Sequence, residues 1–141
     1  KIIEKGALSY VSIENSAGLD EVPLYKLDDI IDTANLMKID VEGYEENVLL
    51  GSKKILADSN LNAIIIEMAD FNRFGSSDEK VHGILSDYGF TPVTYDPLAR
   101  VLNQLKEYSR HGKNVIYVRD LDLATKRIKK SGKIKINGEY Y

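Results

Sequence analysis

Two apolar runs dominate the hydrophobic pattern of the chain, Leu36–Val41 and Leu61–Met68. Both are short and bounded by polar or turn residues, which predicts two buried strands. The first run leads through a Glu-Gly pair into a segment with helical periodicity that ends at Gly51, with Ser52 as the cap of a short continuation. The expected buried face of this helical segment consists of Tyr44, Val48, Ile55 and Leu56. Because a helix separates the two strands, we expect them to be parallel and joined by a right-handed crossover.

Further elements follow the second strand. Ser76 and Glu79 have the spacing of a capping box, which predicts a helix. Phe90–Tyr95 and Asn114–Arg119 predict two more strands. No convincing crossover helix lies between these strands, so we expect an antiparallel pair, with Pro92 at an edge. The remaining expectations are a helical turn at Val101, Leu102 and Leu105, a helix capped by Asp120, and a flexible tail over residues 133–141.

The segment before the first strong strand has a weaker pattern. Residues 7–13 alternate, but both alternating sets contain apolar residues, so the predicted strand has no clear solvent face. Residues 22–26 predict a short edge strand, since Pro23 cannot donate to a ladder. Leu27, Ile30 and Ile31 have the spacing of a short helix.

Composition is ordinary for one globular domain, with 141 residues, 43% hydrophobic and 29% charged. The net charge of −3 provides no overall attraction to nucleic acid or an anionic membrane, and we expect neither as a partner. No apolar run approaches the roughly 20 residues that span a bilayer. No signal peptide is recognisable, and the absence of cysteine excludes disulfides and thiolate metal sites. These features lead us to expect a cytoplasmic location.

Acidic residues stand at the carboxyl ends of both strong strands. Lys38, Asp40 and Glu42 share one face of the first strand by their spacing, and Glu67 lies near the end of the second. In an open α/β sheet, this end of the strands forms the ligand crevice. We therefore expect the three carboxylates to converge and to contact substrate or cofactor. The alternative is a buried Lys38–Asp40 ion pair that only orients the strand end.

Three such carboxylates can also bind Mg²⁺ or Ca²⁺ through oxygen ligands. Carboxylates that hydrogen-bond to backbone amides are the more common outcome, and we expect no metal. For Gly43 we expect a tight strand-to-helix turn in the first place, together with possible ligand contact. His82 follows a core-facing residue and is expected to be solvated, whereas His111, beside Tyr108 and Arg110, is the better candidate for a general base. The basic run from Lys126 to Lys135 is expected to be a solvated helix face.

The segment KIDVEGYEENVLLG, followed by the hydrophobic strand IIIEM, resembles the FkbM family of S-adenosylmethionine-dependent methyltransferases. Tyr25 to Ile30 resembles the LDDL segment that precedes the family signature, and the likeness covers most of residues 22–119. The resemblance implies a class I, Rossmann-like methyltransferase sheet, α/β and mostly parallel with a terminal antiparallel strand. In that sheet the four strands predicted from Leu36 onward would be the fourth to the seventh.

The resemblance also implies function. We expect methyl transfer from S-adenosylmethionine to a hydroxyl of a sugar or another small metabolite, with Asp40, Glu42, Glu67 and His111 as catalytic candidates. Asp40 and Gly43 are the candidates for cofactor binding. A homo-oligomer is possible, and a non-catalytic α/β interaction or oligomerisation module is the alternative function.

The glycine-rich turn and the acidic strand end that hold the cofactor's methionine and ribose in the family do not occur in these 141 residues. We therefore expect residues 1–141 to form a single partial domain, the C-terminal portion of the catalytic domain, which is inactive alone. One edge of its sheet would then be exposed, and residues 1–26 or another chain are expected to cover that edge.

Overall fold

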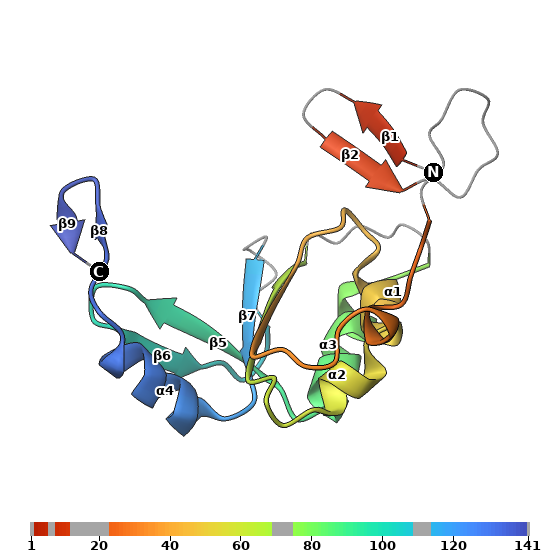
Figure 1. Cartoon of the computed structure of the whole chain (residues 1–141). Helices are drawn as coiled ribbons and strands as arrows, with labels where there is room; N and C mark the ends of the chain where they lie inside the picture. Colours follow the sequence, from red (N-terminus) through yellow and green to blue (C-terminus); the bar gives the residue numbers. More distant parts are fainter. Residues whose placement is uncertain (1, 6–7, 12–22, 69–74, 109–113, 141) are drawn as a thin grey trace.

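The structure is a computed structural model that describes residues 2–5, 8–11, 23–68, 75–108 and 114–140, with only the backbone described before residue 23. Its strands and helices, labelled in Figure 1, are β1 (Ile2–Lys5), β2 (Leu8–Val11), the 3₁₀ helix η1 (Leu27–Asp29), β3 (Leu36–Ile39), α1 (Glu45–Leu50), α2 (Lys53–Ala57), β4 (Ala63–Glu67), α3 (Asp78–Asp87), β5 (Thr91–Asp96), β6 (Val101–Gln104), β7 (Asn114–Val118), α4 (Leu121–Lys130), β8 (Lys135–Ile136) and β9 (Glu139–Tyr140).

A mixed five-stranded sheet in the order β3-β4-β7-β5-β6 forms the centre of this α/β fold. The pair β3–β4 is parallel, as predicted, and the other three pairs are antiparallel. The antiparallel pairing of β5 with β7 was also predicted. Counted by its pairs the sheet is not mostly parallel, while the expected antiparallel orientation of the strand from Asn114 is confirmed, with β7 lying between β4 and β5. Strands β3, β4 and β5 still run in one direction, because β3 is parallel to β4 and β7 is antiparallel to both β4 and β5.

Helices cover both faces of the sheet: α1, α2 and α3 gather over one face, and α4 packs near β6 (Figure 1). Ile64 and Ile66 of β4 point into the larger core and are fully buried, whereas Ile65 between them is half-buried. The larger core consists of Met37, Ile39, Leu49, Ile55, Leu56, Leu61, Ile64, Ile66, Met68, Val81, Leu85, Phe90, Val115 and Tyr117. The smaller one, under α4, is centred on Val93, Val118 and Ala124. The two apolar runs of the sequence therefore form the adjacent strands β3 and β4, whose inward side chains belong to the larger core.

Several local predictions are corrected. Val101, Leu102 and Leu105 do not form a helical turn, since β6 pairs with β5 as a hairpin. Residues 23–26 are not a strand, and the cap of α3 is Ser77 rather than Ser76. Pro92 lies inside the sheet, where β5 pairs with β7. Residues 133–141 contain the short hairpin β8–β9. Asp120 caps α4 as expected, accepting a hydrogen bond from the Leu123 amide at 2.8 Å.

Arg119 connects helices α2 and α3 to the sheet at the end opposite the carboxyl ends of β3 and β4. Its guanidinium donates to the carbonyl oxygens of Tyr88 at 3.2 Å and Asp58 at 2.6 Å, and also to that of Leu56. It also lies 4.3 Å from the ring centroid of Phe90. Burial lowers the pKa of Arg119, and the nearby Asp58 carboxylate opposes that shift. The side chain thus joins the ends of α2 and α3 to the end of β7, where orphan helix carbonyls need donors.

The Asp28 carboxylate connects η1 to the start of α2. It accepts hydrogen bonds from the backbone amides of Lys54 at 2.9 Å and Ile55 at 3.1 Å. Ser52 occupies the predicted cap position, but its hydroxyl donates to the Val48 carbonyl at 2.5 Å instead. The LDD segment therefore supplies the cap of α2 from outside the helix, and it holds the chain before β3 against the helices that follow β3.

Strand β3 is at one edge of the five-stranded sheet, and no described strand pairs with its outer side. Strands β1 and β2 pair with each other in a separate antiparallel hairpin. The expected cover by residues 1–26 is therefore not provided by strand pairing in the described part of that segment. Residues 12–22 lie outside the described residues.

We predict that Asp28→Ala lowers the free energy of unfolding by about 1 kcal/mol, the typical cost of losing a helix cap. The matched control is Asp29→Ala, because the neighbouring Asp29 is exposed. Urea unfolding of both variants measures the difference. Equal stability of the two variants would show that the cap between η1 and α2 contributes nothing.

Candidate functional site

The carboxylates of Asp40, Glu42 and Glu67 converge at the carboxyl edge of β3 and β4, with oxygen atoms that all lie within 4.8 Å of one another. The parallel register explains this, since Ile39 pairs with Ile66 and the next residues of both strands reach the same edge. Asp40 is exposed, while Glu42 and Glu67 are half-buried. The predicted convergence is confirmed. Carboxylates at this spacing can accept hydrogen bonds from hydroxyl groups or coordinate a hard cation such as Mg²⁺.

Lys38 and Asp40 form the ion pair that the sequence suggested, but the pair is not buried. Lys38 Nζ lies 2.5 Å from Asp40 Oδ2, and the two side chains are 55% and 43% exposed. An ion pair in solvent contributes only about 0–1 kcal/mol. The pair can therefore be exchanged for a ligand at little cost, and the prediction of a buried structural pair is wrong.

The turn between β3 and α1 places two successive residues in the left-handed region, Glu42 with φ 52° and Gly43 with φ 102°. Gly43 is buried and adopts its φ without a side chain to clash, which confirms the expected tight turn. Glu42 has a Cβ, and a left-handed conformation costs roughly 1–2 kcal/mol for such a residue. Strain of this kind is concentrated at functional sites. Here the left-handed turn places the Glu42 carboxylate beside those of Asp40 and Glu67.

Glu45 holds this turn in place. Its side chain is only 6% exposed, and Oε1 accepts hydrogen bonds from the backbone amides of Gly43 at 3.1 Å and Val41 at 3.3 Å. The sequence suggested only a favourable charge in the first helical turn for Glu45. The signal that identifies its second role is the Glu two residues after a Gly at a strand-to-helix junction, where a carboxylate can reach back to unpaired amides.

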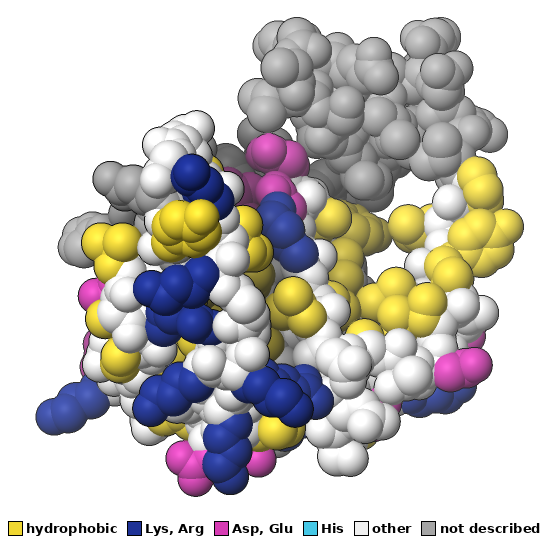
Figure 2. Space-filling model, turned by 60° about the vertical axis from the view of Figure 1, so that its left-hand side comes forward, with side chains coloured by type: hydrophobic (Ala, Val, Ile, Leu, Met, Phe, Trp, Pro, Cys, Tyr) yellow, Lys and Arg dark blue, Asp and Glu magenta, His cyan; other side chains and the backbone are white. Residues whose placement is uncertain are grey.

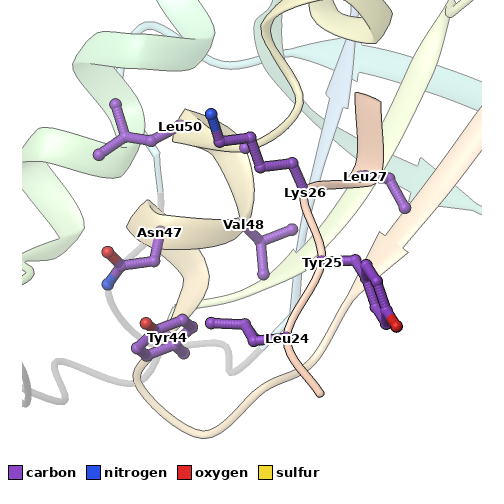
Figure 3. Close-up of a pocket in the computed structure, with 9 residues that line it drawn as sticks. Leu24, Tyr25, Lys26, Leu27, Tyr44, Asn47, Val48 and Leu50 are labelled. Atoms are coloured by element: carbon purple, nitrogen blue, oxygen red, sulfur yellow. The ribbon is translucent and has the colours of Figure 1, made fainter. Parts of the chain in front are cut away.

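The buried face of α1 is turned relative to the prediction. Glu45 and Leu49 are buried, while Tyr44 and Val48 are half-buried. Figure 3 shows Tyr44 and Val48 beside Leu24, across an open groove between α1 and the segment before η1. The groove has a volume of about 470 Å³ and is lined by Leu24, Tyr25, Lys26, Leu27, Tyr44, Asn47, Val48, Leu50 and Gly51.

His82 is half-buried and less solvated than predicted, because it packs against two tyrosines. Its Nδ1 shares a hydrogen bond of 2.9 Å with the hydroxyl of the buried Tyr117, and its ring centroid lies 4.9 Å from that of Tyr108. The Tyr117 hydroxyl also donates to the sulfur of Met68 at 3.7 Å. Burial raises the pKa of Tyr117, with smaller contributions from Tyr108 and Asp78, so the hydroxyl stays protonated at physiological pH. His111 and Arg110 lie outside the described residues, and the general-base role of His111 stays a prediction.

The fold and the site together define a class of protein: a mixed α/β domain whose parallel strands end in a group of carboxylates, followed by a strained turn. Comparison with family models then gives the family, because the model of the methyltransferase FkbM domain matches residues 3–92. The chain belongs to the FkbM methyltransferase family. That match confirms the resemblance of the motifs and points to methyl transfer in general, and the matched range contains Asp40, Glu42, Gly43 and Glu67.

Comparison with curated proteins and with solved structures gave no match to the chain.

The strain at Glu42 gives a direct prediction. Glu42→Gly and Glu42→Ala both remove the carboxylate, but only alanine keeps the Cβ that the left-handed backbone disfavours. We expect the glycine variant to be more stable than the alanine variant by about 1 kcal/mol. At an ordinary backbone position the order is reversed. Urea unfolding of the pair measures it, and a more stable alanine variant would contradict the strained turn.

Proposed function

We propose that this chain takes part in S-adenosylmethionine-dependent methyl transfer to a hydroxyl group of a sugar or another small metabolite. The observation that carries the proposal is the convergence of Asp40, Glu42 and Glu67 at the carboxyl edge of two parallel strands, in a member of a methyltransferase family. Ligands of open α/β sheets bind at this edge.

We further propose that the chain is the C-terminal half of a class I methyltransferase sheet. In that sheet β3, β4, β5 and β7 would be the fourth, fifth, sixth and seventh strands. The common direction of β3, β4 and β5 and the antiparallel β7 support this assignment. The outer side of β3, with which no strand of the described residues pairs, would be the place for the strands that carry the glycine-rich turn.

S-adenosylmethionine, when bound, supplies the methyl group on a positively charged sulfur. An acidic edge fits such a ligand, because carboxylates attract a cation. Asp40 and Gly43 of this chain would line the cofactor, while the groups that hold its methionine and ribose are not among these 141 residues. The chain alone would therefore contribute only part of the binding free energy.

Asp40 and Glu67 would accept hydrogen bonds from the acceptor, and one carboxylate would take the hydroxyl proton as the oxygen attacks. Methyl transfer is an in-line displacement, so the main contribution of the protein is to hold the acceptor oxygen in line with the methyl group. Glu45 would serve this step as a positioning residue, since it fixes the turn on which Glu42 is carried.

The second candidate is a non-catalytic interaction module. The observation that favours it is the apolar groove beside α1, which is lined by the exposed Leu24 and Tyr25 (Figure 3), together with the exposed Leu36 on the edge strand β3. Such surface suits a protein contact. This module would not depend on the three carboxylates, which separates the two candidates.

The test measures transfer of a labelled methyl group from S-adenosylmethionine to a panel of sugars and polyols. The chain is assayed alone and within the longer protein that the half-sheet proposal implies. We expect weak or no cofactor binding by the chain alone in calorimetric titration. Within that longer protein, Asp40→Asn and Glu67→Gln should each lower kcat/KM by about 10²-fold or more.

Asp87→Asn is the matched control, because Asp87 is an exposed carboxylate at the far end of α3. Tight cofactor binding by the chain alone would overturn the half-sheet assignment. Equal activity of all three variants would remove the carboxylates from the mechanism and favour the interaction module.

A further inference from the structure

The charge of the chain is divided unevenly along its length. Residues 121–141 contain six Lys and Arg against two Asp and Glu, a net charge of +4 in a chain whose total is −3. The remaining residues therefore carry −7. The C-terminal part is therefore basic although the whole chain is weakly acidic. The expectation of no anionic membrane partner was based on the total charge and does not apply to this part.

The basic residues gather on one surface. Helix α4 buries Ala124 against the sheet and exposes Lys126, Arg127, Lys129 and Lys130, and Lys133 and Lys135 continue the series into the β8–β9 hairpin. Figure 2 shows the Lys and Arg side chains spread over this face of the molecule, with hydrophobic side chains among them. We call this the C-terminal surface, defined by Lys126, Arg127, Lys129, Lys130, Lys133, Lys135, Ile134, Ile136, Tyr140 and Leu98.

Large apolar side chains are exposed among these cations. Leu98 and Ile134 are each 67% exposed, Tyr140 59% and Ile136 53%. Ile134 and Ile136 also line an open groove of about 410 Å³ with Tyr95, Pro97, Arg100, Ser131 and Gly132. Arg100 is engaged there with the end of α4, donating to the Ser131 carbonyl at 2.8 Å.

We propose that the C-terminal surface binds the anionic headgroup region of a lipid bilayer. The lysines attract the negative surface charge, and Ile134, Ile136, Tyr140 and Leu98 enter the boundary between headgroups and acyl chains. Successive side chains of an extended segment point to opposite faces, so Ile134 and Ile136 lie on the groove side of the β8–β9 hairpin and Lys135 lies beside its pairing partner Tyr140 on the other side. Lys135 Nζ lies 5.5 Å from the Tyr140 ring centroid, which keeps the aromatic ring next to a cation, as interfacial rings commonly are.

The contact is peripheral. No helix among the described residues has the length and apolar character to cross a bilayer. Exposed aliphatic side chains distinguish this surface from one for nucleic acid, where cations act with aromatic stacking platforms.

Sedimentation with vesicles tests the proposal on the full chain. We expect binding to phosphatidylcholine vesicles that contain phosphatidylglycerol, and little binding to phosphatidylcholine alone. Lys130→Gln with Lys133→Gln should weaken binding by about 25-fold, roughly fivefold for each lysine. The matched control, Lys53→Gln with Lys54→Gln, removes two exposed lysines from α2 and should leave binding unchanged.

Ile134→Ser with Ile136→Ser separates insertion from simple charge attraction. Both side chains are largely exposed, so the variant should fold, which circular dichroism checks. We expect it to bind anionic vesicles at least 10-fold more weakly while retaining all its lysines. Unchanged binding of this variant, equal effects of both lysine pairs, or tighter binding to an RNA oligonucleotide than to the anionic vesicles would each overturn the proposal.

Discussion

The parallel pairing of β3 with β4 is the constraint on which the site depends. Its register sets Ile39 opposite Ile66, so the residues that follow both strands emerge at one edge. Burial of Met37, Ile39, Ile64 and Ile66 against α1–α3 fixes this register, because a slip of one residue would turn these side chains away from the core. The apolar core thereby determines where Asp40 and Glu67 lie, although neither belongs to the core.

The turn after β3 adds the third carboxylate by a different means. Two successive left-handed residues reverse the chain, and the buried carboxylate of Glu45 satisfies the amides that the turn leaves without a helical partner. On the other side, Asp28 joins the segment before β3 to the start of α2. Carboxylates thus act in two ways in this fold, as internal caps that hold backbone and as a group at the crevice. Their order in the sequence alone does not separate these uses.

The sequence was sufficient for the elements with strong periodicity and for the edge where the acids meet. It failed where tertiary pairing overrides local pattern, as at Val101–Gln104, which reads as a helical turn but completes a hairpin with β5. The contact of the half-buried His82 with Tyr117 was also missed, because the partner lies 35 residues away on another element. The left-handed φ of Glu42 has no local signal beyond the following glycine. The capping of α2 by Asp28 could not be predicted for the same reason as the histidine contact, because its partners lie 26 and 27 residues away in the sequence.

The most direct test of the central claim uses the absence of cysteine from the chain. Asp40→Cys with Glu67→Cys places two thiols one residue beyond the paired Ile39 and Ile66, where the strand spacing of about 4.8 Å lies within the Cα range of a disulfide. Asp40→Cys with Ala63→Cys is the control, because Ala63 pairs with Leu36, four residues and roughly 13 Å away along the strand. The account predicts rapid intramolecular disulfide formation in the first variant and none in the second, read by mass spectrometry under mild oxidation. Cross-linking of the control pair instead would show that the strands do not run in parallel in this register, and would contradict the account.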